Sequence, residues 1–199
     1  MILYVETNLI MGIAKGRDLE AQNLLLDTPT SVSIVIPSIC FFEAQMTLMQ
    51  DEKYNKVFFD SLNMQINEAE RDRTSENARL LYARLEQSRA SFQDRIDDTK
   101  QRFNFAYNQL VNIAEEIPLQ LAAIQDGLQR NVLQEKHLMD KIILECIIRH
   151  ARLHPDETKV FLSSNTQEFG KPEVSDIFRD AGILYFSKTQ NFVGWLQSQ

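Results

Sequence analysis

The amino-acid sequence predicts an α/β fold, with an open parallel sheet of about four to five strands flanked by helices and interrupted by a long all-helical insertion. Two observations carry this prediction. Short, continuously apolar segments alternate with helical patterns toward both ends of the chain, as in sheets whose two faces are covered. The stretch from about 65 to 135 has almost no Gly or Pro and no strand pattern. We therefore expect a single domain, 1–199, with a helical insertion at 65–135.

The predicted strands and helices follow one another in a regular order. Thr7 and Asn8 can cap the first helix, and Ser38 can cap the third. Pro37 ends the second strand, and Pro155 ends the last long helix. In chain order the predicted elements are a strand over 2–5, helices over 7–13 and 18–26, a strand over 31–37, a helix over 38–50, the insertion, a helix over 138–152, and strands over 159–163 and 182–186.

Within the insertion, mainly apolar residues recur at seven-residue intervals, with Arg89 and Thr99 as exceptions, and this is typical of helices that pack along one stripe. The two interleaved series consist of Leu85, Phe92, Thr99, Ala106 and Ile113, and of Tyr82, Arg89, Ile96, Phe103, Leu110 and Ile117. One straight helix over 75–117, a bend near 88–91 and a helical hairpin are all compatible with this pattern, and a further helix follows Pro118. The stripe can pack within the chain or form the seam of a homodimer.

The composition excludes some classes of function. The net charge of −7 argues against a generally basic surface that would coat nucleic acid. No apolar stretch is long enough to span a membrane, and the N-terminus lacks the basic segment of a secretory signal. Cys40 and Cys146 lie in apolar helical segments without metal-ligand spacing, which fits a reduced compartment. We therefore expect a cytoplasmic protein with no membrane partner.

Three acids occupy positions where an acid is unusual. Glu6 directly follows the first strand, and Glu43 and Asp140 lie on apolar stripes of their helices. The stripe around Glu43 consists of Ile39, Phe42, Met46 and Met49, and that around Asp140 of Ile143, Leu144 and Ile147. A buried acid must be paired, protonated or bound to a cation. Taken singly, Glu43 or Asp140 can simply edge its stripe and pair with a neighbour such as Lys136 or Lys141.

Taken together, the three acids predict a metal site. The carboxyl ends of parallel strands meet at one edge of a sheet, so we expect Glu6, Glu43 and Asp140 to converge there. Converging carboxylates repel one another unless a divalent cation neutralises them, and ligands that are all oxygen suit Mg²⁺ or Mn²⁺. Such a site can hydrolyse a phosphodiester bond with a metal-activated water.

These stretches resemble the motifs of the PIN domain, the metal-dependent nuclease fold of many toxin-type ribonucleases. YVETN matches the strand that leads into the first acid, and IVIPSICFFEA matches the strand and helix that carry an inward Glu. DKIILECII matches the helix that a third acid opens, and FLSSNTQEF matches the last strand with its polar end. The resemblance covers about 1–60 and 136–190 and leaves the helical insertion outside it.

The resemblance implies an endonuclease that depends on Mg²⁺ or Mn²⁺, with single-stranded or structured RNA as the expected substrate and DNA as the alternative. The expected metal ligands are Glu6, Glu43, Asp140, Asn165 and Glu168, of which the first four are the expected catalytic residues. Thr7, Asn8 and Ser163 would support them. Glu6 stands where the family usually has Asp, and Asn165 is a neutral ligand, so both positions keep oxygen chemistry.

A toxin or defence role, with an antitoxin or another protein as partner, follows from the resemblance only by analogy. The competing interpretation is a catalytically degenerate PIN scaffold. Such a protein would bind a partner or a nucleic acid through its helical insertion instead of cleaving RNA.

The insertion also contains a group of arginines. Between 71 and 102 the chain has eight basic and six acidic residues, and nearly all the basic ones are Arg, which suits phosphate recognition. The candidate nucleic-acid contacts are Arg71, Arg73, Arg79 and Arg84. The alternative is a solvated helix face held by internal ion pairs.

One further cluster offers a different metal. Cys146, His150 and His154 lie four residues apart on one helix face, which suits part of a zinc site. The alternative is structural, with Cys146 in the core and both histidines near the negative end of the helix dipole.

Overall fold

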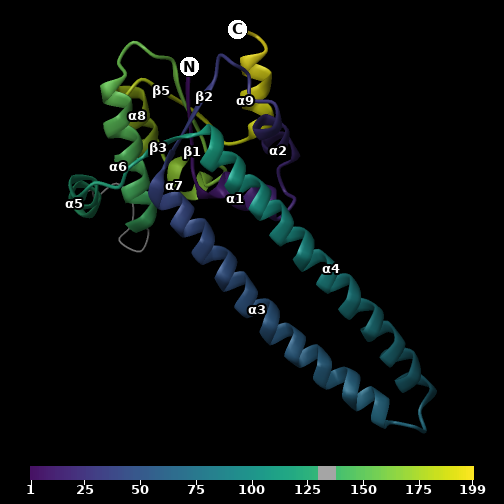
Figure 1. The fold of residues 1–199 in the computed structure, drawn as a ribbon. Coiled ribbons are helices and arrows are strands. Elements are labelled where there is room, and N and C mark those ends of the chain that lie inside the picture. The colour runs from purple at the N-terminus through teal and green to yellow at the C-terminus, as the bar shows by residue number, and fades with distance from the viewer. Residues whose placement is uncertain (130–137) are drawn as a thin grey trace. The chain divides into compact units, whose positions relative to one another are not determined.

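The computed structural model describes residues 1–129 and 138–199, and the chain divides into two compact units (Figure 1). One unit, made of Met1–Ala44 and Arg102–Gln199, contains the sheet and is called the α/β unit below. The other, Gln45–Gln101, contains helix and a short connection and is called the helical unit. None of the described helices is long and apolar enough to cross a membrane.

The α/β unit is built on a parallel sheet of five strands in the order β3-β2-β1-β4-β5. The strands are β1 (Ile2–Val5), β2 (Ser33–Pro37), β3 (Glu115–Ile117), β4 (Lys159–Leu162) and β5 (Ile183–Phe186). β1 and β4 are buried along their whole length, which explains their continuous apolar patterns. The predicted fold class, an open parallel sheet flanked by helices, is confirmed.

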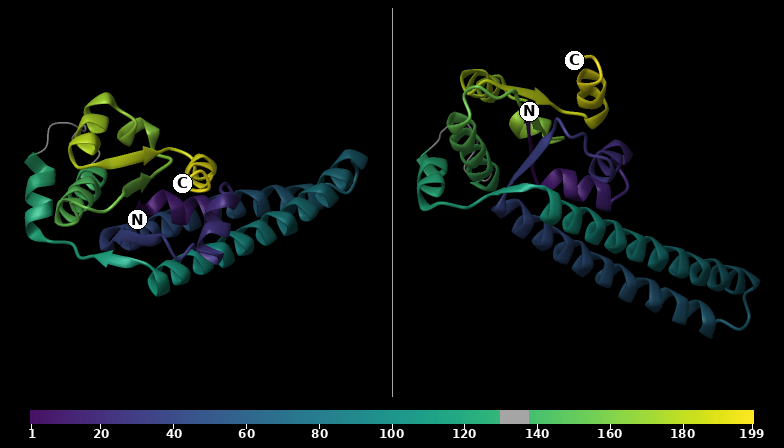
Figure 2. Two further views of the ribbon diagram at one scale, coloured as in Figure 1. Left: turned by 90° about the horizontal axis from the view of Figure 1, so that it is seen from above. Right: turned by 45° about the horizontal axis from the view of Figure 1, so that its top comes forward.

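The described helices connect the strands, and within the α/β unit helices lie on the sheet, as two further views show (Figure 2). They are α1 (Thr7–Ala14), α2 (Leu19–Leu26), α3 (Ser38–Arg71), α4 (Glu76–Ile113), α5 (Leu121–Gln129), α6 (Leu138–Leu153), α7 (Thr166–Phe169), α8 (Pro172–Asp180) and α9 (Thr189–Leu196). The helices predicted over 7–13, 18–26 and 138–152 are present as α1, α2 and α6, each with limits within a few residues of the expected ones.

Side-chain alternation along the strands assigns helices to the two faces of the sheet. Tyr4 of β1 meets His150 of α6 edge to face, with ring centroids 5.6 Å apart. Phe161 of β4 is in register with Tyr4 and contacts Phe178 of α8 on the same face. Phe186 of β5 contacts the aromatic rings of α9 on the other face. α6 and α8 therefore cover one face, and α9 covers the other.

The carboxyl ends of β1 and β4 meet where the chain changes direction across the sheet. From β1 the chain crosses to β2 and on to β3, and it then returns to β4 on the other side of β1. Open α/β sheets bind ligands at such a switch point. The register pairs Val5 with Leu162, so the residues that follow them, Glu6 and Ser163, emerge side by side.

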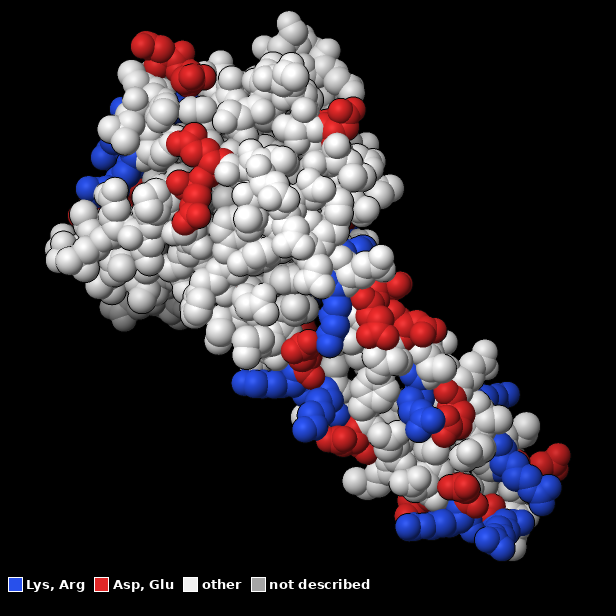
Figure 3. Space-filling model, viewed as in Figure 1, with Lys and Arg blue, Asp and Glu red and all other residues white. Residues whose placement is uncertain are grey.

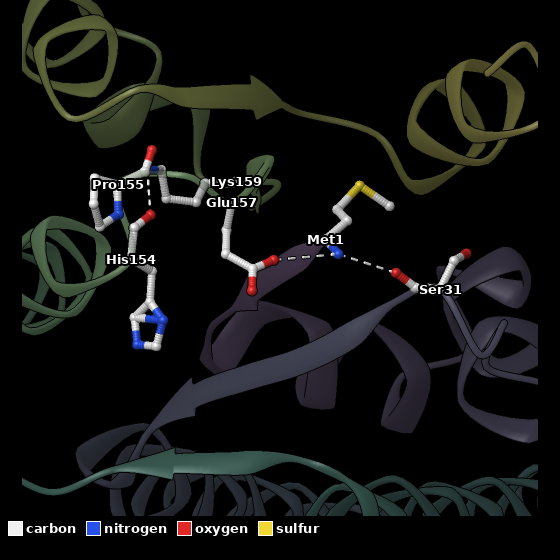
Figure 4. A network of polar contacts seen from close by, with 6 residues as sticks. All are labelled: Met1, Ser31, His154, Pro155, Glu157 and Lys159. Atoms are coloured by element: carbon white, nitrogen blue, oxygen red, sulfur yellow. Dashed lines mark hydrogen bonds and ion pairs between the residues drawn. The ribbon is translucent and has the colours of Figure 1, made fainter.

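The amino ends of the same strands are fixed by polar contacts (Figure 4). The N-terminal amine donates a hydrogen bond to the carbonyl oxygen of Ser31 at 3.1 Å and lies 3.6 Å from the carboxylate of Glu157. Lys159, buried at the start of β4, donates to the carbonyl oxygen of His154 at 2.8 Å. Because α6 ends at Leu153, this contact also satisfies backbone just beyond the helix.

The helical unit is an antiparallel hairpin formed by α3 and α4, which residues 72–75 join. Phe92 of α4 contacts Phe58 and Phe59 of α3, with ring centroids 4.7 and 5.4 Å apart. An ion pair of 2.9 Å between Lys100 and the α3 residue Glu52 ties the helices further along. Phe92 belongs to the predicted seven-residue stripe, so in this unit the stripe packs within the chain.

α3 runs further than the sequence pattern indicated, whereas α4 lies within the predicted range of 75–117. The helix predicted over 38–50 continues to Arg71, because Leu62 and Ile66 are buried and extend its packing face. α4 runs without a break from Glu76 to Ile113, so there is no bend near 88–91. The helical unit spans Gln45–Gln101. The insertion at 65–135 stays a prediction, and its last residues, 130–135, lie outside the described residues.

The strand β3 was not predicted. It contains only three residues, and two of them, Glu115 and Glu116, are exposed acids with low strand propensity. The strand exists because Val35, Ile36 and Pro37 of β2 offer a free edge with which it pairs in parallel. The helix expected directly after Pro118 begins at Leu121.

Candidate metal and catalytic site

Glu6 lies at the carboxyl end of β1 and is itself the N-cap of α1. One carboxylate oxygen, Oε2, accepts a hydrogen bond from the backbone N–H of Asn8 at 2.8 Å. The other, Oε1, accepts one from the hydroxyl of Ser163 at 2.7 Å. The side chain is 3% exposed. The helix cap was predicted at Thr7 and Asn8, one or two residues too late. Glu6 itself caps the helix, in addition to being a candidate metal ligand.

Burial raises the pKa of Glu6 from its ordinary value of 4.5 to about 7. The hydrogen bonds from Asn8 and Ser163 lower this pKa, while the negative charges of Glu43 and Asp140 raise it. The three acids come from distant parts of the sequence and still act on one another electrostatically. The predicted convergence of these carboxylates on one metal stays a prediction.

Glu43 reaches this edge from the second turn of α3. The Thr7 hydroxyl donates a hydrogen bond to its Oε2, and the same hydroxyl lies 3.4 Å from the carbonyl oxygen of Cys40. Burial raises the pKa of Glu43, the bond from Thr7 lowers it, and the charge of Asp140 raises it. Thr7 thus orients Glu43, which is the kind of supporting role that the sequence predicted for it.

The reason given for Glu43 was nevertheless wrong. The stripe that was expected to face the core is largely exposed, since Phe42, Met46 and Met49 are all open to solvent. The buried face of this part of α3 instead contains Cys40 and Ala44. Glu43 lies between the two faces and is half-buried. Helical periodicity identified an apolar face correctly but assigned it to the wrong side.

Asp140 lies in the first turn of α6, and its neighbours Ile143 and Ile147 are buried as predicted. The side-chain amide of Asn165 donates a hydrogen bond to Oδ1 of Asp140 at 3.1 Å. Asn165 is also the N-cap residue of α7, although its side chain makes no capping bond there. The side chain is therefore committed to Asp140, and the structure brings these two predicted residues together.

Ser163 connects Glu6, at the end of β1, with Asn165, at the start of α7. Its hydroxyl donates to Glu6 and accepts from the backbone N–H of Asn165 at 3.1 Å. Its own backbone N–H donates to the carbonyl oxygen of Phe186 at 3.1 Å. The hydroxyl of Tyr185 donates to the carbonyl oxygen of Ser163 at 2.8 Å. Ser163 is thus fixed by β5 while it holds Glu6.

Tyr185 was not singled out from the sequence. Burial, together with the charge of Glu6, raises its pKa to about 12, so the phenol stays protonated and can donate. The alternation of β5 places Tyr185 on the face that Phe161 occupies in β4, which is the signal that would have pointed to it.

Glu168 was predicted as an additional ligand. It is buried in α7, and its Oε2 forms an ion pair with Lys171 at 2.7 Å. Lys171 supplies a positive charge next to this predicted ligand, and no sequence pattern indicated it. The bond between the two is an i, i+3 contact across the end of α7.

The acids offer the oxygen donors that a divalent metal ion binds, but their side chains do not surround one point. Within 1–129 and 138–199, no three His, Cys, Asp or Glu side chains lie close enough together to hold a metal ion. Each of the three central acids instead bonds to a different hydroxyl or amide. An ionised carboxylate keeps further lone pairs when it accepts one such bond, and Mg²⁺ and Mn²⁺ favour carboxylate oxygens. The donor set therefore fits a hard cation, provided that the side chains turn toward a common point.

The alternative zinc cluster has a structural arrangement. Cys146 is buried, and burial raises the pKa of its thiol to about 11, away from the thiolate that zinc requires. His150 contacts the hydroxyl of Tyr4 at 2.9 Å and the carboxylate of Glu115 at 3.1 Å. His154 stacks on His150 with ring centroids 4.4 Å apart.

The candidate arginines belong to the helical unit. Arg71 pairs with the exposed Glu68 at 2.9 Å, and Arg73 and Arg79 line a hollow of about 330 Å³ that also includes two acids. Lys and Arg side chains alternate with Asp and Glu over this unit (Figure 3). The surface is mixed in charge, and a role in nucleic-acid binding stays a prediction for these residues and for Arg84.

Comparisons with known proteins are limited to the family level. No curated protein and no solved structure matches the sequence. A family model described as PIN domain matches residues 3–169, a span that begins within β1 and ends with α7. The match therefore includes Glu6, Glu43 and Asp140, together with the residues that hold them at the switch point. This chain belongs to the PIN domain family.

Proposed function

We propose that this PIN-domain chain is an endonuclease that depends on Mg²⁺ or Mn²⁺ and that RNA is its favoured substrate. PIN domains are generally nucleases, so the family supports hydrolysis of nucleic acid as the reaction class. The observation that carries the proposal is the electrostatic coupling of Glu6, Glu43 and Asp140 at the switch point of the sheet. Acids with perturbed pKa values at such an edge favour a catalytic role over a structural one.

The metal would be held by the predicted oxygen donors. Glu6, Glu43 and Asp140 would supply carboxylates, Asn165 would supply its amide oxygen, and Glu168 would add a further carboxylate. When bound, the cation would lower the pKa of a coordinated water and stabilise the charge that develops on the phosphate.

The remaining residues of the site would position these donors. Ser163 holds Glu6, and Thr7 holds Glu43, each through a hydroxyl donor. Because both bonds favour the ionised carboxylate, they keep the acids available as ligands close to neutral pH. Lys171 pairs with Glu168 at 2.7 Å and would orient its carboxylate.

Cleavage of a fluorescent single-stranded RNA in Mn²⁺, beside a DNA of the same sequence, tests the proposal. We expect EDTA to abolish cleavage, and Glu43→Gln and Asp140→Asn each to reduce it by about 100-fold or more, because each removes a charged ligand. Asp176→Asn is the matched control, since this exposed acid of α8 pairs with Arg179 and has no role in the site.

Calorimetric Mn²⁺ titration of the same variants gives a readout that does not depend on activity. Loss of binding in Glu43→Gln and Asp140→Asn, with normal binding in Asp176→Asn, would support the assignment. Cleavage that survives both site substitutions would reject it. Cleavage of DNA alone would keep the nuclease and reject RNA as the substrate.

The competing function is a degenerate PIN scaffold that acts as an interaction module. The observation in its favour is that no three acids in the described residues lie close enough to share a metal. The same titration separates the two functions, because a degenerate scaffold would bind no Mn²⁺ and cleave neither RNA nor DNA at any concentration of protein.

A toxin or defence role extends the proposal further. In that setting the helical unit would be an insertion in the nuclease scaffold, and Arg71, Arg73, Arg79 and Arg84 would contact the RNA. Replacing all four with Gln should weaken RNA binding and reduce its dependence on salt if this is correct. Unchanged affinity with a normal fold would remove the helical unit from substrate binding.

A further inference from the structure

The outer face of α3 in the helical unit has an unexplained apolar pattern. Met46, Met49, Val57 and Met64 are 44–65% exposed, although each is a large apolar residue. Lys53 and Asp60 lie between them and are also exposed. Successive members of this set are three or four residues apart, which places all six on one side of a straight helix. These six residues are called the α3 stripe below.

The α3 stripe is separate from the face that holds the hairpin together. The packing face of α3 in this unit includes Phe59, Leu62 and Ile66, of which the last two are buried and the first contacts Phe92. The stripe therefore adds nothing to the hairpin, and exposing three methionines along one face has a cost in water. Methionine-rich faces are typical of surfaces that bind another helix.

The two charges of the α3 stripe have no partner in the part of the chain that the structure describes. Neither Lys53 nor Asp60 forms an ion pair or hydrogen bond with any described residue. They are two helical turns apart on the same helix, about 10 Å along its axis, which is too far for them to pair with each other. An external helix that offered the opposite charges at the same spacing would satisfy both.

The α3 stripe of a second copy meets this requirement. Lys53 comes four residues after Met49, and Asp60 comes four residues before Met64. An antiparallel copy whose two-fold axis passes beside residues 56 and 57 therefore sets Lys53 opposite Asp60, twice. The same register sets Met49 opposite Met64 and brings the two Val57 side chains together at the axis. The pattern is complementary to itself under two-fold symmetry, as an isologous interface requires.

We propose that the α3 stripe is the interface of a homodimer, in which two helical units pack through antiparallel α3 helices. Two hairpins joined in this way form a four-helix arrangement, the usual means by which a helical hairpin covers a second apolar face. The contact is small and contains two exposed ion pairs, so the dissociation constant is expected on the order of micromolar.

Sedimentation of the full chain across a concentration series tests the proposal, with charge reversals as the probe. Lys53→Glu places a second acid opposite Asp60 at both ends of the interface, and Asp60→Lys sets two positive charges together in the same way. Each variant alone should weaken dimerisation by at least about tenfold. Arg95→Glu is the matched control, because it makes the same charge change at an exposed position of α4.

A mixture of the two variants gives the decisive result. When Lys53→Glu is mixed with Asp60→Lys, each mixed pair regains two opposite charges in the same register, so association should return. Circular dichroism confirms that these exposed substitutions keep the fold. A chain that stays monomeric at every concentration would overturn the proposal. Equal effects of Lys53→Glu and Arg95→Glu, or a mixture that stays monomeric, would overturn it as well.

Discussion

The α/β unit and the helical unit belong to one chain but are stabilised in different ways. In the helical unit, all of whose residues are described, Leu62, Ile66 and Ala69 are the only buried apolar residues, and Leu62 and Ala69 are each still 8% exposed. The α/β unit buries whole strands, and it also buries charged groups such as Glu6 and Lys159. A buried carboxylate needs surrounding donors and a rigid frame, which a sheet covered on both faces provides. A two-helix hairpin leaves its outer faces available for other chains.

The largest effect should come from breaking the core of the α/β unit. Phe161→Ala removes a fully buried ring of β4 that contacts Phe169 and Phe178, and it should cost about 3–5 kcal/mol in free energy of unfolding. Phe58→Ala makes the same change in the helical unit, where the ring is 49% exposed, and should cost about 1 kcal/mol. Urea unfolding followed by fluorescence and circular dichroism measures both values. Equal costs would show that the two regions are packed alike.

A smaller effect on the free energy of unfolding is expected from the buried carboxyl group of Glu6. The folded protein holds the pKa of Glu6 at about 7, above its ordinary value of 4.5, so the protonated acid is favoured on folding. Without metal, the contribution of Glu6 to the free energy of unfolding should therefore be most favourable below about pH 4.5. It should fall as the pH rises toward 7. Glu6→Gln should remove this loss and be more stable than the wild type at pH 8 by about 2–3 kcal/mol.

Thermal unfolding at pH 5 and pH 8, in EDTA and in Mn²⁺, measures the contribution of Glu6. Added Mn²⁺ should stabilise the wild type at pH 8 and leave Glu6→Gln unchanged, because only the ionised acid is a ligand. If Glu6→Gln follows the same pH dependence as the wild type, the carboxylate is not the group that titrates.

The smallest effect is expected from a glycine substitution in α4, which tests whether the two units unfold independently. Ala83→Gly, at an exposed position in α4, should lower the stability of the helical unit by about 1 kcal/mol through backbone entropy. Amide hydrogen exchange should then speed up within Gln45–Gln101 and stay the same in β1 and β4. Faster exchange throughout both regions would mean that the chain unfolds as one cooperative unit.

The sequence was sufficient for four of the five strands of the sheet, but not for the fifth strand or for every helix. β1, β2, β4 and β5 were predictable because buried parallel strands are continuous apolar runs. β3 was not, since Glu115 and Glu116 carry no strand signal and the strand depends on its pairing with β2. The extension of α3 to Arg71 was also missed, because polar residues between Leu48 and Leu62 conceal a packing face that only the partner helix defines.

The candidate site was predictable for a related reason and with one error. Glu6 and Ser163 follow strands, so their proximity was a consequence of strand order and register. Glu43 was selected from the apolar stripe that contains Phe42 and Met46, yet that stripe is exposed. Periodicity shows that a helix has an apolar face, but it does not show whether that face meets the core or another molecule. The bond from Asn165 to Asp140 could not be foreseen, because it depends on side-chain rotamers at the N-termini of two helices that only the fold brings together.

The hydrogen bond between Ser163 and Glu6 joins residues 157 positions apart. A contact of such high sequence separation can form only after most of the chain has been synthesised and β1 has found β4. During synthesis, therefore, Glu6 lacks its hydrogen bond from Ser163, and Asp140 lacks its hydrogen bond from Asn165, until residues 163–165 have been made. If the chain is the nuclease proposed above, its site is complete only after residue 165 has been made.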